Sequence, residues 1–129
     1  MKNTLIEVCV EGIDGMIAAQ DAGADRVELC ASLLEGGLTP SYGTIKAALD
    51  VARIPFHVIV RPRGGDFLYS EAEFASMCDD VRALRDLGVA GAVVGCLLPN
   101  GTIDEGRMSE LVRCAGGINV NRLFNGLTI

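Results

Sequence analysis

Two cysteines occupy matching places in two short runs of residues that favour β-strands. Cys9 lies in IEVCV (6–10) and Cys30 ends RVELC (26–30). If these runs are neighbouring parallel strands about 4.8 Å apart, both thiols face one side and can share a soft metal ion. Two thiolates suit Cu(I). The alternative is a pair of ordinary buried thiols, and on spacing alone that alternative is favoured.

A second candidate site is RPRGGDF (61–67), which directly follows a third strand-like run. Parallel sheets bind ligands at the carboxyl ends of their strands. Arg61 and Arg63 share one face of the alternating backbone, and Gly64 and Gly65 allow backbone amides to approach an anion closely. The segment therefore predicts a clamp for a small carboxylate or phosphate.

Carboxylates beside these two sites could move protons. Glu28 and Asp66 are the candidate catalytic groups, provided that burial or a neighbouring charge raises one pKa towards neutrality. Arg61 also has a structural alternative, in which it only neutralises Glu7 and Glu28 inside the fold, where an unpaired charge is costly. In that case the glycine pair is only a turn.

Other reactive residue types are expected to be structural. His57 is the only histidine and lies in the middle of a strand-like run, so a catalytic triad or a His-based metal site would depend on it alone. The loop LEGGLTPS (34–41) either closes over a ligand or only connects two elements, with Thr39 or Ser41 capping the next helix. Three further cysteines are expected to be core thiols: Cys78, Cys96 and Cys114.

Strand-like and helix-like stretches alternate along the chain. Strands are expected over 5–10, 26–30, 56–61, 90–96 and 118–123. Helices are expected over 13–22, from about 45 to 54, from Ser70 to 87, and from about 105 to 115. Capping boxes predict the last two helix starts, at Ser70 with Glu73 and at Thr102 with Glu105. This alternation predicts a parallel sheet.

The side-chain alternation within the strands favours a barrel over an open sheet. An open sheet covered by helices on both faces needs strands that are apolar on both sides, whereas three strands here carry one polar face. We therefore expect an α/β fold of the (β/α)8 TIM-barrel type, with apolar faces under the helices and polar faces lining the lumen. Residues 1–129 would form a single domain, a partial barrel of about four and a half β/α units.

Composition excludes several classes of function. The net charge is −6 and the 11 Lys and Arg form no cluster, which argues against nucleic acid. The longest apolar run, 89–98, is about half of a membrane span, and the first residues do not form a signal peptide. Five cysteines without a C-x-x-C pair are expected to be reduced thiols, which indicates a cytoplasmic protein.

Four sequence blocks resemble the signature of a known family, the CutC family. They are IEVCV (6–10), GADRVELC (23–30), EGGLTPSYG (35–43) and RPRGGDFLYSEAEF (61–74), and the resemblance runs from about residue 4 to residue 117. It implies a cytoplasmic TIM-barrel protein of copper homeostasis, in which cysteines of these blocks bind Cu(I). The resemblance favours Cys9 and Cys30 as metal ligands over core thiols.

Two departures from the family pattern concern the end of the chain. Where the family has a block of the type TFHRAFD, this chain reads NVNRLFN (119–125), so that Asn121 replaces the histidine and Asn125 the aspartate, while Arg122 and Phe124 match. A base supplied by that histidine is absent. The chain stops at Ile129, and we expect a truncated barrel whose exposed edges make it form a homo-oligomer.

Three functions follow from the sequence. The leading one is copper homeostasis of the CutC type, with Cu(I) on the lumen-facing Cys9 and Cys30. The alternative is a TIM-barrel enzyme, in which Arg61, Arg63 and the glycine amides bind a small anionic substrate. The third is a non-functional remnant that folds only in part.

Overall fold

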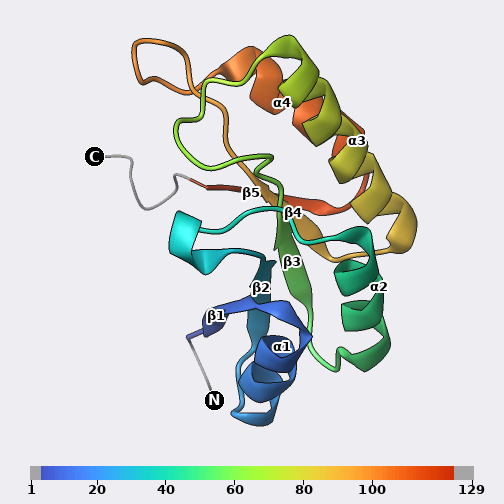
Figure 1. Ribbon diagram of the computed structural model, residues 1–129. Coiled ribbons are helices and arrows are strands. Elements are labelled where there is room, and N and C mark those ends of the chain that lie inside the picture. The colour runs from blue at the N-terminus through green and yellow to red at the C-terminus, as the bar shows by residue number, and fades with distance from the viewer. Residues whose placement is uncertain (1–3, 124–129) are drawn as a thin grey trace.

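The computed structural model describes residues 4–123 and consists of alternating strands and helices (Figure 1). The strands are β1 (Glu7–Glu11), β2 (Arg26–Cys30), β3 (Phe56–Ile59), β4 (Gly91–Val94) and β5 (Asn119–Arg122). The helices are α1 (Gly12–Asp21), α2 (Tyr42–Val51), α3 (Glu71–Leu87) and α4 (Glu105–Ala115), with a short 3-10 turn, η1 (Leu33–Glu35), after β2. The predicted order of elements is confirmed.

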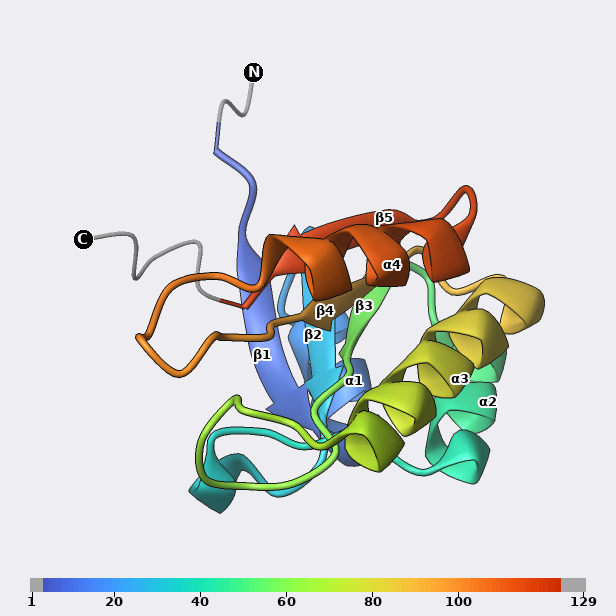
Figure 2. The ribbon, with the colours of Figure 1, turned by 90° about the horizontal axis from the view of Figure 1, so that it is seen from above.

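The strands form one sheet in sequence order, and every neighbouring pair is parallel. The four helices lie on one side of this sheet, as Figures 1 and 2 show from two directions. The other side is concave, because side chains of β1 and β2 line the same cavity of about 240 Å³ as Asn121 and Arg122 of β5. A curled parallel sheet with helices on its outer side is the arrangement of a barrel segment.

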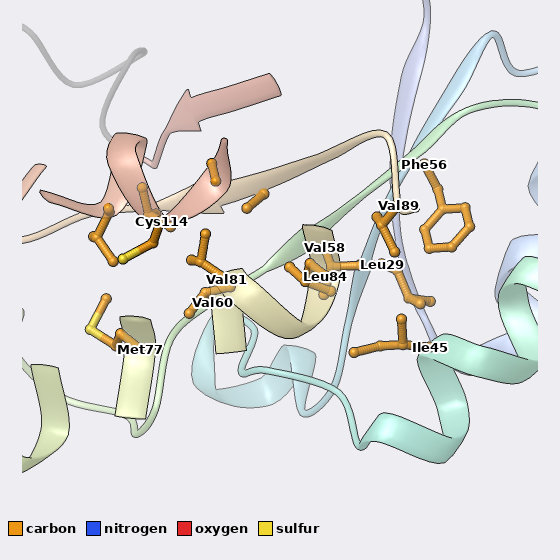
Figure 3. Packing of buried hydrophobic residues seen from close by; sticks show 14 of the residues in the cluster. Leu29, Ile45, Phe56, Val58, Val60, Met77, Val81, Leu84, Val89 and Cys114 are labelled. Atoms are coloured by element: carbon orange, nitrogen blue, oxygen red, sulfur yellow. The ribbon is translucent and has the colours of Figure 1, made fainter. Parts of the chain in front are cut away.

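The predicted division of the strands into two faces is also confirmed. Strand residues that belong to the hydrophobic core alternate along each strand: Val8 and Val10, Val27 and Leu29, Phe56 and Val58, Ala92 and Val94. Figure 3 shows Leu29 and Val58 of this layer beside helix residues such as Ile45 of α2 and Leu84 of α3. The residues between them face the concave side and are free to be polar.

Two of the three capping residues predicted from the sequence agree with the structure, in that Ser70 and Ser41 cap helices; the third, Thr102, does not, because it is bound within the preceding turn. Ser70 forms the predicted capping box with Glu73 at the start of α3. Ser41, rather than Thr39, caps α2. The predicted capping box of Thr102 with Glu105 is wrong.

Asp104 takes the place of that predicted cap. Its Oδ1 accepts from the backbone N–H of Arg107 at the start of α4. The backbone N–H and the hydroxyl of Thr102 both donate to Oδ1 of Asn100, at 3.0 and 2.6 Å. Thr102 is therefore part of the preceding turn and is not available to the helix.

Position 91, on the concave face, has room only for a glycine because two neighbouring groups lie close to it. A Cβ atom there would lie 2.8 Å from the carbonyl oxygen of Asn119 and 2.9 Å from the His57 ring. We expect Gly91→Ala to lower the free energy of unfolding by about 1–3 kcal/mol, because the buried ring and the neighbouring strand must both shift. Urea denaturation followed by circular dichroism measures this change.

Gly117→Ala is the matched control, because an added Cβ there meets nothing within 4 Å. Its effect should stay within about 0.5 kcal/mol. Equal stability of the two variants would contradict the close packing of Gly91 against His57.

Candidate metal site

Cys9 of β1 and Cys30 of β2 meet on the concave face of the sheet. The register pairs Cys9 with Glu28 and Glu11 with Cys30, so the two cysteines are diagonal neighbours. Their Sγ atoms lie 3.5 Å apart. The proximity predicted from the strand pattern is therefore present.

Glu28 completes a cluster of three potential metal ligands. One ligand atom each from Cys9, Glu28 and Cys30 lies within 4.8 Å of the other two. The sequence singled out Glu28 as a proton carrier, and the structure also places its carboxylate beside the thiols, with Oε1 3.9 Å from the Cys30 Sγ. The parity of β2 put Glu28 and Cys30 on one face, and that signal could have added Glu28 to the metal ligands.

The surroundings of the cluster disfavour the charged forms of its two thiols and its carboxyl group. Burial raises the pKa of the Cys9 thiol, with further increases from Glu28 and Glu7. Burial also raises the pKa of Cys30 far above its ordinary value, and contact with Cys9 adds to this. The pKa of Glu28 is raised by burial and then by Glu7. Both thiols are thus protonated at neutral pH, and a cation would stabilise the deprotonated forms.

The guanidinium of Arg61 is bound by carbonyl oxygens of the protein. Its Nη1 donates to the carbonyl oxygens of Glu35 and Gly37 at 2.5 and 3.2 Å, and its Nη2 donates to that of Gly65 at 3.0 Å. The guanidinium also stacks on the Phe67 ring, 4.9 Å from its centroid. The buried Arg61 therefore holds two loops together.

Glu7 and Glu28, the carboxylates that Arg61 was expected to neutralise, are not its partners. Arg26 forms the ion pair with Glu7. No hydrogen bond or ion pair between Arg61 and Glu7 or Glu28 occurs in residues 4–123. That structural alternative is wrong, because the side chain points to the loops beyond the strand ends.

Arg63 and Asp66 are bound to each other. Arg63 forms ion pairs with Glu73, at 2.5 Å, and with Asp66, at 3.0 Å. Asp66 also accepts from the backbone N–H of Leu68, and this bond, followed by Arg63, lowers the pKa of its carboxyl group. An external anion would have to compete with both carboxylates for Arg63, and Asp66 is held in its charged form.

The glycine pair Gly64 and Gly65 also lies next to a carboxylate, that of Glu35. Gly65 has a φ of +87°, a backbone conformation in which a residue with a side chain would be strained. A Cβ at Gly64 would lie 3.1 Å from Oε2 of Glu35. The position of Glu35 next to these amides disfavours the phosphate or carboxylate expected there.

His57 is buried on the concave face and pairs with Asn121. The Nδ2 of Asn121 donates to Nδ1 of His57 at 2.7 Å, so the residue that replaces the family histidine is a direct neighbour of the remaining one. Burial lowers the pKa of His57, followed by the charge of Arg26, while Glu7 opposes the shift. Asn125, the second departure, and Phe124 lie outside the described residues. The expected structural role of His57 agrees with this burial and pairing.

The other three cysteines are core thiols as expected. Cys78, Cys96 and Cys114 are all buried within the hydrophobic core. Burial raises the pKa of Cys78 and of Cys96 to about 11 in each case. They are buried structural groups, in contrast to the exposed Cys9.

Comparison with known proteins matches the chain to a sequence family. The model of the CutC family matches residues 4–125. Over 116 residues the chain is 72% identical to the family protein CutC of Mesorhizobium japonicum, covering 90% of this chain and 45% of that protein. Over 122 residues it is 49% identical to the CutC of Proteus mirabilis, covering 93% and 49%. The chain spans about half the length of these curated relatives.

Solved structures give the same result. The putative copper homeostasis protein CutC from Streptococcus agalactiae superposes with a TM-score of 0.86 at 35% identity, over 92% of this chain and 58% of that one. A mandelate oxidase mutant matches with a TM-score of 0.52 at 16% identity, over 88% and 42%, which concerns the fold alone. The five strands are thus part of a TIM-type barrel. Among the described residues no helix is long and apolar enough to cross a membrane.

The burial of His57 leads to a measurable pH dependence. We expect its folded-state pKa to lie below the ordinary 6.5, because the buried ring favours the neutral form. The neutral ring then contributes stability above about pH 6.5, and this contribution is lost as the pH falls below that value. Since the chain has one histidine, an NMR titration of its ring protons reports this pKa directly.

The matched variant for this titration is Asn121→Asp. A carboxylate at this distance favours the imidazolium, so the His57 pKa should rise by one or more units of pH. A wild-type pKa at or above 6.5, with no rise in the variant, would show that the ring is neither buried nor paired as described.

Proposed function

Because the chain belongs to the CutC family, we propose that it is a copper-homeostasis protein that binds Cu(I) through Cys9 and Cys30. The observation that carries the proposal is the contact between the two thiols, whose Sγ atoms lie 3.5 Å apart on the concave face. Copper is the cargo of such a site rather than a catalyst. The ligands come from two adjacent strands, so the sheet itself holds them together.

The donor set supports a soft, singly charged metal ion. Thiolates prefer Cu(I), whereas a carboxylate such as Glu28 prefers harder cations. Two thiolates and Glu28, with Glu7 nearby, would concentrate negative charge in a half-buried place. A bound cation offsets that repulsion, and Glu28 then acts as a neighbouring counter-charge or a third ligand.

The free state of the cysteines supports the cytoplasm as the compartment of this protein. Five free cysteines are present, and two of them are in contact without a bond. Such a pair persists as thiols in a reducing compartment. We therefore keep the cytoplasmic location as part of the proposal.

The enzyme alternative has less support from the contacts. Arg61 and Arg63 already donate to protein carbonyls and carboxylates. Asp66 is an anion held by Arg63, and Glu28 lies in the cysteine cluster. A small anion would have to displace these partners, so copper binding ranks first. The anion site at Arg61, Arg63, Gly64 and Gly65 stays a prediction, which a phosphate titration of Arg61→Ala tests.

An anaerobic Cu(I) titration against a competing chelator tests the copper proposal. We expect one tightly bound Cu(I) per chain, and a loss of affinity of at least about 100-fold in Cys9→Ser and in Cys30→Ser, or about 2.8 kcal/mol. Affinity should rise with pH between about 6 and 8, because both thiols release a proton on binding.

Cys78→Ala is the control, since Cys78 is a buried thiol on the outer side of the sheet. It should bind Cu(I) as the wild type does. Wild-type binding no tighter than that of the Cys9→Ser/Cys30→Ser double variant would refute the copper site and favour the anion-site or remnant alternatives.

Within residues 4–123, β1 and β5 each pair with a strand on one side only, which supports the expected homo-oligomer. At one edge, α4 and β5 border an open groove of about 510 Å³ with apolar lining from Met108, Val112 and Val120. At the other edge, Leu5 and Ile6 beside β1 are 58% and 48% exposed. We propose that a second copy packs β1 against β5, which would continue the parallel sheet and bring Glu11 towards Arg122.

Light scattering over a dilution series tests this assembly. Val112→Asp should shift the chain towards the monomer, because Val112 is 51% exposed in the groove and a charge there opposes its burial. Tyr42→Asp, on the exposed surface of α2 away from both edges, should leave the association unchanged. A wild-type monomer at every concentration would contradict the proposal.

A further inference from the structure

The segment after β2 turns back over the metal site. Ala31 and Leu38 exchange backbone hydrogen bonds of 2.9 and 2.7 Å, which close residues 31–38 into a tight loop. Three residues in it have positive φ: Ser32 at 49°, Gly36 at 88° and Gly37 at 97°. We name residues 31–38 the cover loop.

The cover loop is packed directly on Cys30. A Cβ atom at Gly37 would lie 3.3 Å from the Cys30 Sγ, so the Gly37 backbone passes just above the thiol. Cys30 is only 1% exposed, whereas Cys9 on the edge strand is open to solvent. One ligand of the pair is thus sealed by the loop, and the other is not.

Hydrophobic burial does not hold the tip of the cover loop. Leu34 is fully exposed and Leu33 is 38% exposed, so the two leucines at the tip contribute little packing, whereas Leu38 at the base of the loop is half-buried. Ser32 donates its backbone N–H to Oε1 of Glu11 at 2.7 Å, but that contact is exposed. Besides the packing of Gly37 on Cys30, the loop is anchored by the hydrogen bonds from Arg61.

Arg61 joins the cover loop to the rest of the molecule. Its Nη1 donates to Glu35 and Gly37 within the loop, while Nη2 donates to Gly65 in the connection between β3 and α3. Just beyond the loop, the backbone N–H of Arg61 donates to the hydroxyl of Thr39 at 2.8 Å, and the backbone N–H of Thr39 donates to the carbonyl oxygen of Arg61 at 3.1 Å. The planar guanidinium reaches all three carbonyls at once, which an ammonium group cannot do in the same arrangement.

We propose that Arg61 is a positioning residue that latches the cover loop over Cys30 and so limits how fast this thiol reacts and exchanges its metal ion. The thiol part stands on the contacts alone, and the metal part rests on the proposed function. Entry and exit of Cu(I) would then proceed from the Cys9 side or require the loop to lift.

Thiol labelling of each cysteine, resolved by mass spectrometry, tests the latch without copper. We expect iodoacetamide to modify Cys30 at least about 10-fold faster in Arg61→Lys than in the wild type, with labelling of the buried Cys78 unchanged. Arg63→Lys is the matched control, because Arg63 has no hydrogen bond or ion pair with the cover loop in the described chain. It should leave the Cys30 rate as in the wild type.

Gly37→Ala provides a second variant that leaves Arg61 in place. Its φ of +97° and the 3.3 Å approach to Cys30 should push the loop away, and Cys30 should again react faster than in the wild type, with the Cys78 rate unchanged. An unchanged Cys30 rate in Arg61→Lys overturns the latch, and if Gly37→Ala alone raises the rate, the loop covers Cys30 without being held by Arg61. A parallel rise at Cys30 and Cys78 also overturns it, since that result shows only general destabilisation.

Copper release provides a separate measurement. Transfer of Cu(I) from the loaded protein to an excess of chelator should be about 10-fold faster in Arg61→Lys than in the wild type or Arg63→Lys. If no variant or wild type binds copper, the proposed function fails, while the labelling rates still decide whether Arg61 holds the cover loop.

Discussion

The alternation of side chains along parallel strands is the constraint on which the rest of this structure depends. Every second residue of β1 to β4 packs under the helices, and this apolar layer makes the sheet stable. The intervening residues are then released from the core. Thiols, carboxylates and an imidazole can therefore gather on the concave face without disrupting the packing that holds the strands together.

The same constraint explains why the cysteine pair forms where it does. Cys9 and Cys30 are two register steps apart on adjacent strands, and both have concave-face parity. A slip of one residue in either strand would place one thiol under the helices and separate the pair. The hydrophobic core thus fixes the site indirectly, since only one register buries Val8, Val10, Val27 and Leu29 together.

Charge is arranged differently on the strands and in the loops. On the strands, burial and then the charges of Glu28 and Glu7 raise the pKa of the Cys9 thiol, and these carboxylates favour an incoming cation. In the loops after β3, the arginines Arg61 and Arg63 are bound by carbonyls and carboxylates and so stabilise loop conformation. The cysteine cluster is therefore better suited to a cation than the loop after β3 is to an anion.

Several features were determined by the sequence itself, because they depend on local or periodic patterns. Strand and helix order, the two strand faces, the Ser70 capping box and the proximity of Cys9 to Cys30 each follow from residues a few positions apart or from the period of two. The partners of Arg61, Arg63 and Asn121, and the cap at Asp104, were decided only by the tertiary structure. Their donors and acceptors come from loops whose paths no local pattern specifies. A guanidinium that can reach an external anion can equally reach a carbonyl of its own chain, and only the folded loops decide which is closer.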